Sequence, residues 1–194
     1  MKKFRAVILV MVFFIGFSQF VYAAEDKPKD SRGSYSAYSK NLFQGKQEMK
    51  RGEFQMAQEY FIKATGSQRL TEGLAFAATA SYKINDLKVA ESYIEEAEKQ
   101  DTGSVTKLRI AGYKALIYLK QGKENEGMKA LQEYIALYSH LDPLMNIREV
   151  QAMAIKKDVD MRKLEALLDE QITWHEDEIE QYEKTGTGFY GRYD

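Results

Sequence analysis

Few residues of this chain are of the types that catalyse reactions. The sequence has no cysteine, only two histidines, and no serine within a G-x-S-x-G motif. No residue near His140 suggests a catalytic partner for it. His175 precedes Glu178 by three positions, so a helix would place both side chains on one side, where they could bind a metal ion. Because two ligands do not complete a site and His175 lies on an apolar stripe, we predict two structural histidines and no metal.

Carboxylates are concentrated near the C-terminus of the chain. Two suitably placed carboxylates can hydrolyse a glycosidic bond, so a cell-wall hydrolase that uses these acids together with His175 is one hypothesis. Their spacing instead predicts a solvated helix face, with nothing nearby to raise a carboxyl pKa, and no glycine-rich phosphate loop opens a helix. We therefore predict no catalytic residue, no cofactor and no enzymatic activity. The acidic cluster comprises Glu176, Asp177, Glu178, Glu180 and Glu183.

Three lysines occupy equivalent positions and indicate binding rather than catalysis. Each stands two residues before a glycine or an asparagine, and each directly follows an apolar residue. If the helices that carry them stack, the ammonium groups form a column that can hold the carboxylates of an acidic peptide, with apolar contacts beside it. A lysine in the last turn of a helix also suits the helix dipole and solvent, so a solvated edge is the alternative. The candidate partner-binding residues are Lys50, Lys83, Lys120, Met49, Tyr82 and Leu119.

The elements that must position these lysines are helices. Residues 38–142 are rich in Ala, Leu, Glu, Lys and Gln, which favour helix, and they lack the period-2 alternation of a strand. Three segments of this range align on small residues, at successive shifts of 33 and 37 residues. The aligned positions are Gly45, Ala78 and Ala115 in a first helix, Gly52, Asn85 and Gly122 in a turn, and Ala57, Ala90 and Gly127 in a second helix.

This pattern resembles the tetratricopeptide repeat (TPR), a helix–turn–helix unit of 34 residues. The small residues suit close helix crossings, and Gly or Asn suits the left-handed turn that ends a helix. The family's aromatic residue in the first helix and its terminal proline are missing, and the third copy is longer. The resemblance implies an all-α, TPR-like α-solenoid of about three repeats, with ligands bound against the first helices. An ordinary helical bundle is the alternative.

The segments that flank the repeats have other compositions. Near the N-terminus, three basic residues precede an apolar run and then a small-residue cleavage site, which is typical of a signal peptide. An uncleaved anchor helix is the alternative. At the other end an apolar stripe predicts helices that cover the open end of the solenoid. We expect a signal peptide at 1–23, a flexible linker at 24–37, repeats at 38–142, a helical cap at 143–184 and a flexible, aromatic tail at 185–194.

The charge balance restricts the class of partner. The chain has 28 Lys and Arg, of which three lie in the signal peptide, so 25 remain against 29 Asp and Glu. Nucleic-acid-binding domains usually carry a basic excess, so no nucleic acid is expected. We predict a periplasmic or secreted, non-enzymatic scaffold or adaptor of the cell envelope that binds a protein or peptide and keeps no membrane span after signal cleavage. A structural subunit of a homo-oligomer is the alternative.

Overall fold

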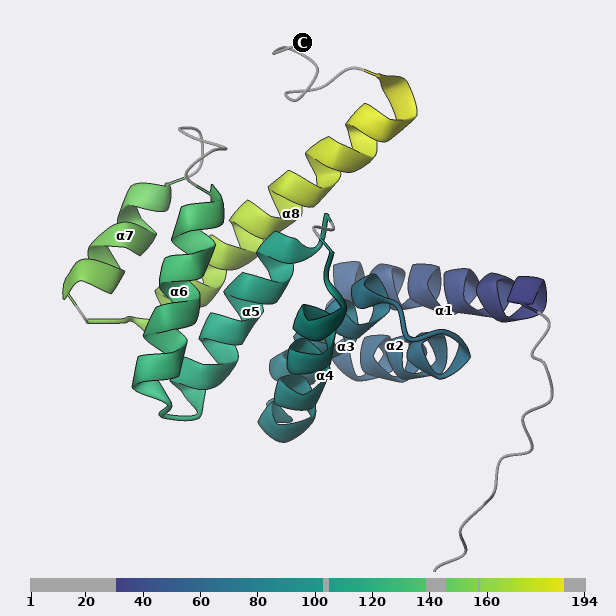
Figure 1. Cartoon of the computed structure of the whole chain (residues 1–194), viewed down its shortest axis with the longest axis horizontal. Coiled ribbons are helices and arrows are strands. Elements are labelled where there is room, and N and C mark those ends of the chain that lie inside the picture. The colour runs from purple at the N-terminus through teal and green to yellow at the C-terminus, as the bar shows by residue number, and fades with distance from the viewer. Residues whose placement is uncertain (1–30, 103–104, 139–145, 157, 187–194) are drawn as a thin grey trace, which may run out of the picture.

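The described part of the chain is helical throughout. The computed structural model describes residues 31–102, 105–138, 146–156 and 158–186. These residues form helices and no strand, which confirms the all-α prediction. Figure 1 shows their arrangement. The helices are α1 (Ser31–Arg51), α2 (Phe54–Ser67), α3 (Thr71–Lys83), α4 (Leu87–Gln100), α5 (Lys107–Lys120), α6 (Glu124–Tyr138), α7 (Ile147–Lys156) and α8 (Met161–Thr185).

The first six helices form three pairs, α1–α2, α3–α4 and α5–α6, whose members pack on each other more extensively than on any other helix (Figure 1). The same turn joins each pair. Gly52, Asn85 and Gly122 have φ values of +79°, +65° and +76°. The residue after each donates its N–H to the carbonyl five positions earlier, over 2.9, 2.8 and 2.9 Å, which satisfies a carbonyl at the helix end. The predicted left-handed turn residues are therefore confirmed.

Small residues lie where the paired helices cross. A Cβ at Gly45 of α1 would lie 2.4 Å from the Phe61 ring of α2, and a Cβ at Gly127 of α6 would lie 2.7 Å from Leu119 of α5. Side chains at either position would force the paired helices apart. The close crossings thus recur at two of the positions that the sequence alignment selected.

Two groups of buried apolar side chains connect the pairs. The smaller group joins α1, α2 and α3, and in it the Phe61 and Phe76 rings stack with centroids 5.4 Å apart. The larger group extends from α3 to α8 and includes Tyr82, Tyr113 and Leu168. Helix α8 is therefore part of the main core rather than an addition to it.

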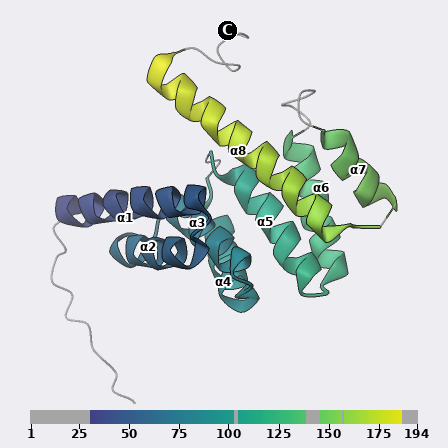
Figure 2. The same ribbon diagram turned by 180° about the vertical axis from the view of Figure 1, so that it is seen from behind.

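The C-terminal helices do more than the cap that we predicted for the end of the stack. Helix α7 packs on α6, whereas α8 packs on α5 and reaches α3 with its side chains. Figures 1 and 2 show α8 lying across one face of the α5–α6 pair, with its last turns extending beyond α5. Asp160 begins α8 by accepting the N–H groups of Arg162 and Lys163 at 3.0 and 3.1 Å. Helix α8 thus covers part of the first-helix surface on which we expected a ligand.

The N-terminal boundary also differs from the prediction. Helix α1 begins at Ser31, so residues 31–37, which we assigned to a linker, are helical. The predicted signal peptide, His140 and the tail beyond residue 186 lie outside the described residues. No helix in the described ranges combines the length and the apolar character needed to cross a membrane.

Candidate functional site: a cleft between α1 and α8

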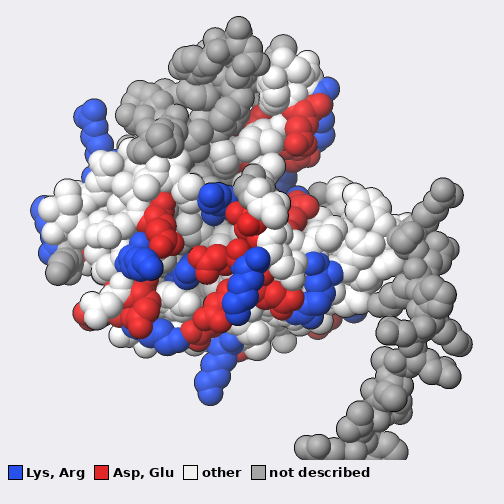
Figure 3. All heavy atoms as spheres, in the orientation of Figure 1, with Lys and Arg blue, Asp and Glu red and all other residues white. Residues whose placement is uncertain are grey.

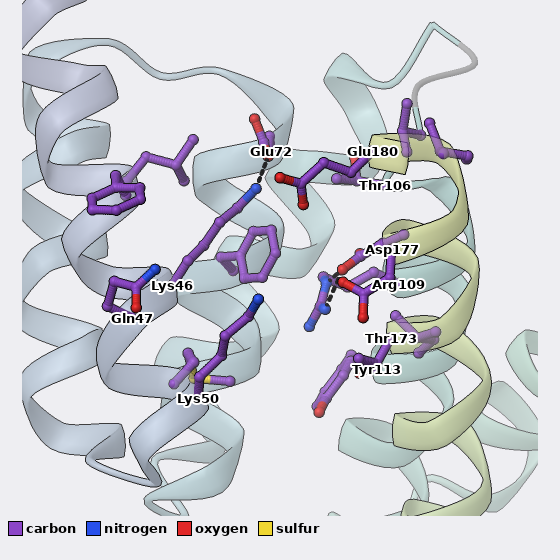
Figure 4. A pocket seen from close by; sticks show the side chains of 18 of the residues that line it. Lys46, Gln47, Lys50, Glu72, Thr106, Arg109, Tyr113, Thr173, Asp177 and Glu180 are labelled. Carbon is purple, nitrogen blue, oxygen red and sulfur yellow. Dashed lines mark hydrogen bonds and ion pairs between the residues drawn. The ribbon is translucent and has the colours of Figure 1, made fainter. Parts of the chain in front are cut away.

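An open cleft of about 790 Å³ separates α1 from the C-terminal half of α8. Figure 4 shows α1 and α8 as its two walls, with side chains from both helices pointing into it. Residues of α3 and α5 form its floor. The cleft therefore combines α1 from the N-terminal part of the chain, α3 and α5 from its middle, and α8 from its C-terminal part.

The α1 wall is aromatic toward its start and basic toward its end. Tyr35, Phe43, Lys46 and Lys50 follow one another at intervals of eight, three and four residues, so they share one face of the helix. The two aromatic side chains are 56% and 58% exposed. Lys46 forms an ion pair with Glu72 of α3. Lys50 forms no ion pair with any described residue, so its cation is available to a ligand.

The floor holds a buried arginine. Arg109 of α5 lies with its guanidinium carbon 4.1 Å from the centre of the Phe76 ring. It donates two hydrogen bonds to Glu176 of α8, at 2.7 and 2.6 Å, and one to Thr79 at 3.2 Å. Burial lowers the pKa of Arg109, but the adjacent Glu176 carboxylate, together with Tyr113 and Asp169, raises it by more. The bidentate pair therefore stays charged and fixes α8 to α5 at the base of the cleft.

A second cluster ties α8 to α3. The Lys83 ammonium donates to Glu165 at 2.6 Å and also to Asp169. The hydroxyls of Tyr82 and Tyr113 donate to the same two carboxylates, Tyr82 to Glu165 at 2.9 Å and Tyr113 to Asp169. Burial lowers the pKa of Lys83, yet its two carboxylate partners raise it by more. Burial raises the pKa of Glu165, yet Lys83, together with Tyr82 and Lys120, lowers it by more. Each group in this cluster is satisfied from within the chain.

The α8 wall of the cleft is acidic. Asp177, Glu180 and Glu183 line it at intervals of three residues, and Figure 3 shows acidic atoms gathered at this end of α8. Glu180 pairs with Lys184, which lowers the pKa of Glu180, and the two lysines of the α1 wall lower it further. Asp177 and Glu183 form no ion pair within the described residues. The two walls thus carry opposite charges, and the field of one reaches the other.

The three predicted lysines do not form one free column. Lys50 lines the cleft. Lys83 also lines it, but its cation is held by α8 and its side chain is only 12% exposed. Lys120 is exposed and lies 4.5 Å from the centre of the Tyr82 ring, where it contributes to lowering the pKa of Glu165. The second and third lysines therefore face carboxylates of α8, so the acidic segment beside them belongs to this chain.

The three apolar candidates also separate. Met49 is half-buried and lines the cleft. Tyr82 is 1% exposed and belongs to the core. Leu119 is half-buried and packs where Gly127 crosses it. Only Met49 is placed to contact a ligand in the cleft.

The sequence reasoning missed the residues that shape the cleft most. Tyr35 and Phe43 share a helical face with Lys50, and that spacing was readable, but we placed Tyr35 in a linker. Arg109 gives no signal of its own, because its partner Glu176 is 67 positions away. The acidic cluster was predicted to be a solvated face, and for Glu176 this is wrong, since its side chain is 19% exposed and paired with Arg109.

The histidine in α8 has a structural environment. His175 is half-buried, and burial lowers the pKa of its imidazole more than Glu176 raises it. No group of three or more potential metal ligands occurs among the residues that the structure describes. The described site therefore offers charged and aromatic side chains for recognition, in a cleft open to solvent.

Comparisons with known proteins return no match: no family model, no curated protein and no solved structure matches the chain. The function is accordingly argued from the cleft.

Proposed function

We propose that the chain is a non-enzymatic interaction protein of the cell envelope, periplasmic or secreted, that binds a peptide or protein partner in the cleft between α1 and α8. The helix pairs are, in this proposal, TPR-like repeats stacked as an α-solenoid, and the cleft is the part of their first-helix surface that α8 leaves open. One observation carries the proposal: a concave surface exposes large aromatic side chains beside unpaired charges.

The aromatic side chains favour a protein partner. Tyr35 and Phe43 remain more than half exposed although each offers a large apolar area. Aromatic side chains of this kind dominate the energy of protein interfaces when a partner covers them. Beside them Lys50 provides a cation that no described residue neutralises. This combination suits an apolar anchor with a polar rim.

The rival hydrolase has less support at this site. A general acid in glycoside hydrolysis needs a carboxyl with a raised pKa. In the α8 wall the pKa of Glu180 is lowered by Lys184 and by the lysines of α1. Glu176 is already engaged by Arg109. Glu180 and Glu176 therefore suit the binding of cations better than proton donation.

Site-specific photo-crosslinking in the native envelope tests the proposal. A photoreactive residue replaces Phe43 in the cleft, and in a matched control it replaces Ile155 of α7, which is 82% exposed. We expect one defined adduct from position 43, weakened by Lys50→Glu, and no such adduct from position 155. Equal adducts from both positions, or none from position 43, would overturn the proposal. An adduct that contains a second copy of this chain would establish the homo-oligomer instead.

A further inference from the structure

The two walls of the cleft carry opposite charges, and this restricts the partner that fits between them. We infer that the cleft receives an amphipathic helix whose two flanks are oppositely charged. Its acidic flank faces Lys46 and Lys50 of α1, its basic flank faces the carboxylates of α8, and its apolar edge lies on the aromatic residues. The inference rests on the proposed function, because it specifies the partner of the same cleft.

Unpaired charge on both walls is the first argument. Lys50 on one wall and Asp177 and Glu183 on the other form no ion pair within the described residues, although all three line the cleft. The lysines of α1 lower the pKa of Glu180, so the walls already interact electrostatically across the gap. A partner with both signs, each toward the matching wall, neutralises both sets at once.

A partner of a single sign fits only one wall. An acidic segment gains from Lys46 and Lys50 but is repelled by Asp177, Glu180 and Glu183. A basic segment gains from α8 and is repelled by α1. Juxtaposed like charges disfavour a wrong partner as effectively as matched charges favour the right one. The bipolar cleft therefore selects against both uniformly charged partners.

The apolar residues of the cleft lie along its length. Tyr35 and Phe43 are eight residues apart on α1, about 12 Å along a helix axis. Val105, which is 42% exposed, and the half-buried Ile179 line the cleft as well. An apolar stripe on a helical partner repeats every three or four residues, so two of its turns cover the distance between the aromatic residues.

The helical form of the partner follows from what the walls can offer its backbone. The walls and the floor are helices whose own backbone groups are already paired, and the described residues contain no strand edge. An extended peptide would receive no ladder of backbone hydrogen bonds here. A helix satisfies its own backbone and needs only side-chain contacts, as in helix-in-groove recognition.

Three synthetic helical peptides of about 14 residues, or four turns, test the inference. They share one apolar stripe and differ in their flanks: one acidic and one basic, both acidic, or both basic. Their affinity for the full mature chain is measured by fluorescence anisotropy at low salt. We expect the bipolar peptide to bind about tenfold more tightly than either uniform peptide, because a factor of this size corresponds to the combined contribution of two or three exposed ion pairs. This advantage should shrink in high salt, which screens the ion pairs.

Charge reversal of one wall must change the order of the peptides. With Lys46→Glu and Lys50→Glu both walls are acidic, and we expect the uniformly basic peptide to bind best. With Asp177→Lys, Glu180→Lys and Glu183→Lys both walls are basic, and the uniformly acidic peptide should lead. Lys50→Glu alone serves as a milder variant that retains the Lys46–Glu72 pair. The matched control reverses Lys88 and Lys129, which are exposed on α4 and α6, and should leave the order unchanged.

The outcomes separate the two proposals. If a uniform peptide binds as tightly as the bipolar one, or if wall reversal leaves the order unchanged, the inference is wrong, while loss of that binding in Phe43→Ser keeps the cleft as a peptide site. If none of the peptides binds but position 43 still yields a specific adduct, the inference is wrong and the proposed function stands. If both experiments are negative, both proposals are wrong.

Discussion

Helix α8 has two halves that differ in burial and in charge pairing. From Met161 to Ile172 its three leucines and Ile172 are buried, and Glu165 and Asp169 are bound by Lys83 and the two tyrosines. None of residues 173–186 is fully buried. In this range Glu176 pairs with Arg109 of α5 and Glu180 pairs with Lys184 of α8 itself, whereas Asp177 and Glu183 form no ion pair with a described residue. The first half is satisfied within the chain, whereas the second presents charge to the cleft.

This difference separates the part of α8 that stabilises the fold from the part that, in our proposal, recognises a partner. The apolar stripe predicted from the sequence continues through both halves, but its burial decreases from Leu168, which is fully buried, to Ile179 and Tyr182, which are half-buried. The stripe residues in the first half of α8 are buried in the main core, and the second half, where burial is incomplete, forms the wall of the cleft. The predictions below test this division from the largest expected effect to the smallest.

Truncation of the apolar stripe should affect the two halves very differently. Leu168→Ala leaves a cavity in the main core and should lower the free energy of unfolding by about 2–5 kcal/mol. Ile179→Ala removes a half-exposed side chain and should cost less than about 1 kcal/mol. Chemical denaturation followed by circular dichroism measures both. Equal losses would show that the second half of α8 is as integral to the core as the first.

Replacing Lys83 should destabilise the fold more than replacing Lys50, the other lysine that lines the cleft. Lys83→Met leaves Glu165 and Asp169 without their cation at a largely covered site, and should cost about 1–3 kcal/mol, less than for a fully buried pair. Lys50→Met removes a cation that no described residue pairs, so the unfolding midpoint should hardly move. If Lys50→Met is the more destabilising of the two, the assignment of Lys83 to structure and of Lys50 to binding is wrong.

Acid should remove the stability that Glu165 contributes in the first half of α8. The folded-state pKa of Glu165 is lowered, so its contribution is present above its unfolded value of about 4.5 and is lost as the pH falls through the folded value. Glu165→Gln removes this contribution at neutral pH. Unfolding curves between about pH 7 and 3 should therefore converge for the variant and the wild type as the solution becomes acidic. Parallel curves over that range would contradict a stabilising Glu165–Lys83 pair.

At alkaline pH the stabilising contribution of Lys83 is lost as the pH rises, whereas that of Glu165 is lost as the pH falls. The folded-state pKa of Lys83 is raised, so its contribution is complete below the unfolded value of 10.5 and is lost as the pH rises through the folded value. Lys83→Met should therefore show a smaller alkaline loss of stability than the wild type. The same denaturation measurements, extended above pH 10, check this expectation.

Local features of the fold were predictable from the sequence, and non-local ones were not. Gly52, Asn85 and Gly122 mark the three turns because a left-handed residue is needed wherever a helix ends so tightly. The path of α8 could not be predicted in this way. An amphipathic stripe predicts that one face of a helix is buried, but not which helix buries it. The partner of Glu165, for example, is Lys83, 82 positions away in the sequence.

The candidate site depends on these non-local pairings. A lysine in the last turn of a helix looks the same in the sequence whether it is solvated, like Lys50, or held by another helix, like Lys83. Because residues 24–37 are polar in composition, we predicted a linker there and a first helix only after it. Tyr35 was therefore assigned to the linker, and the aromatic face of α1 was not predicted. The acids of α8 were identified as a cluster, but only the fold separates Glu176, which pairs with Arg109, from its neighbours.

Neutralising the exposed half of α8 should give the smallest effect on stability and still a measurable one on binding. Asp177→Asn with Glu183→Gln keeps the size of both side chains and removes two charges that no described residue pairs. We expect the unfolding midpoint to stay within the error of the measurement, because solvent already satisfies these carboxylates. The bipolar peptide should bind a few-fold more weakly, since its basic flank loses two of its three partners.

The matched control, Glu170→Gln with Glu178→Gln, changes the charge of α8 equally at positions outside the cleft lining. If that control weakens peptide binding by the same factor, the effect comes from the net charge of the helix, and the cleft wall has no specific role. If only the first pair weakens binding, the carboxylates of the α8 wall take part in recognising the partner.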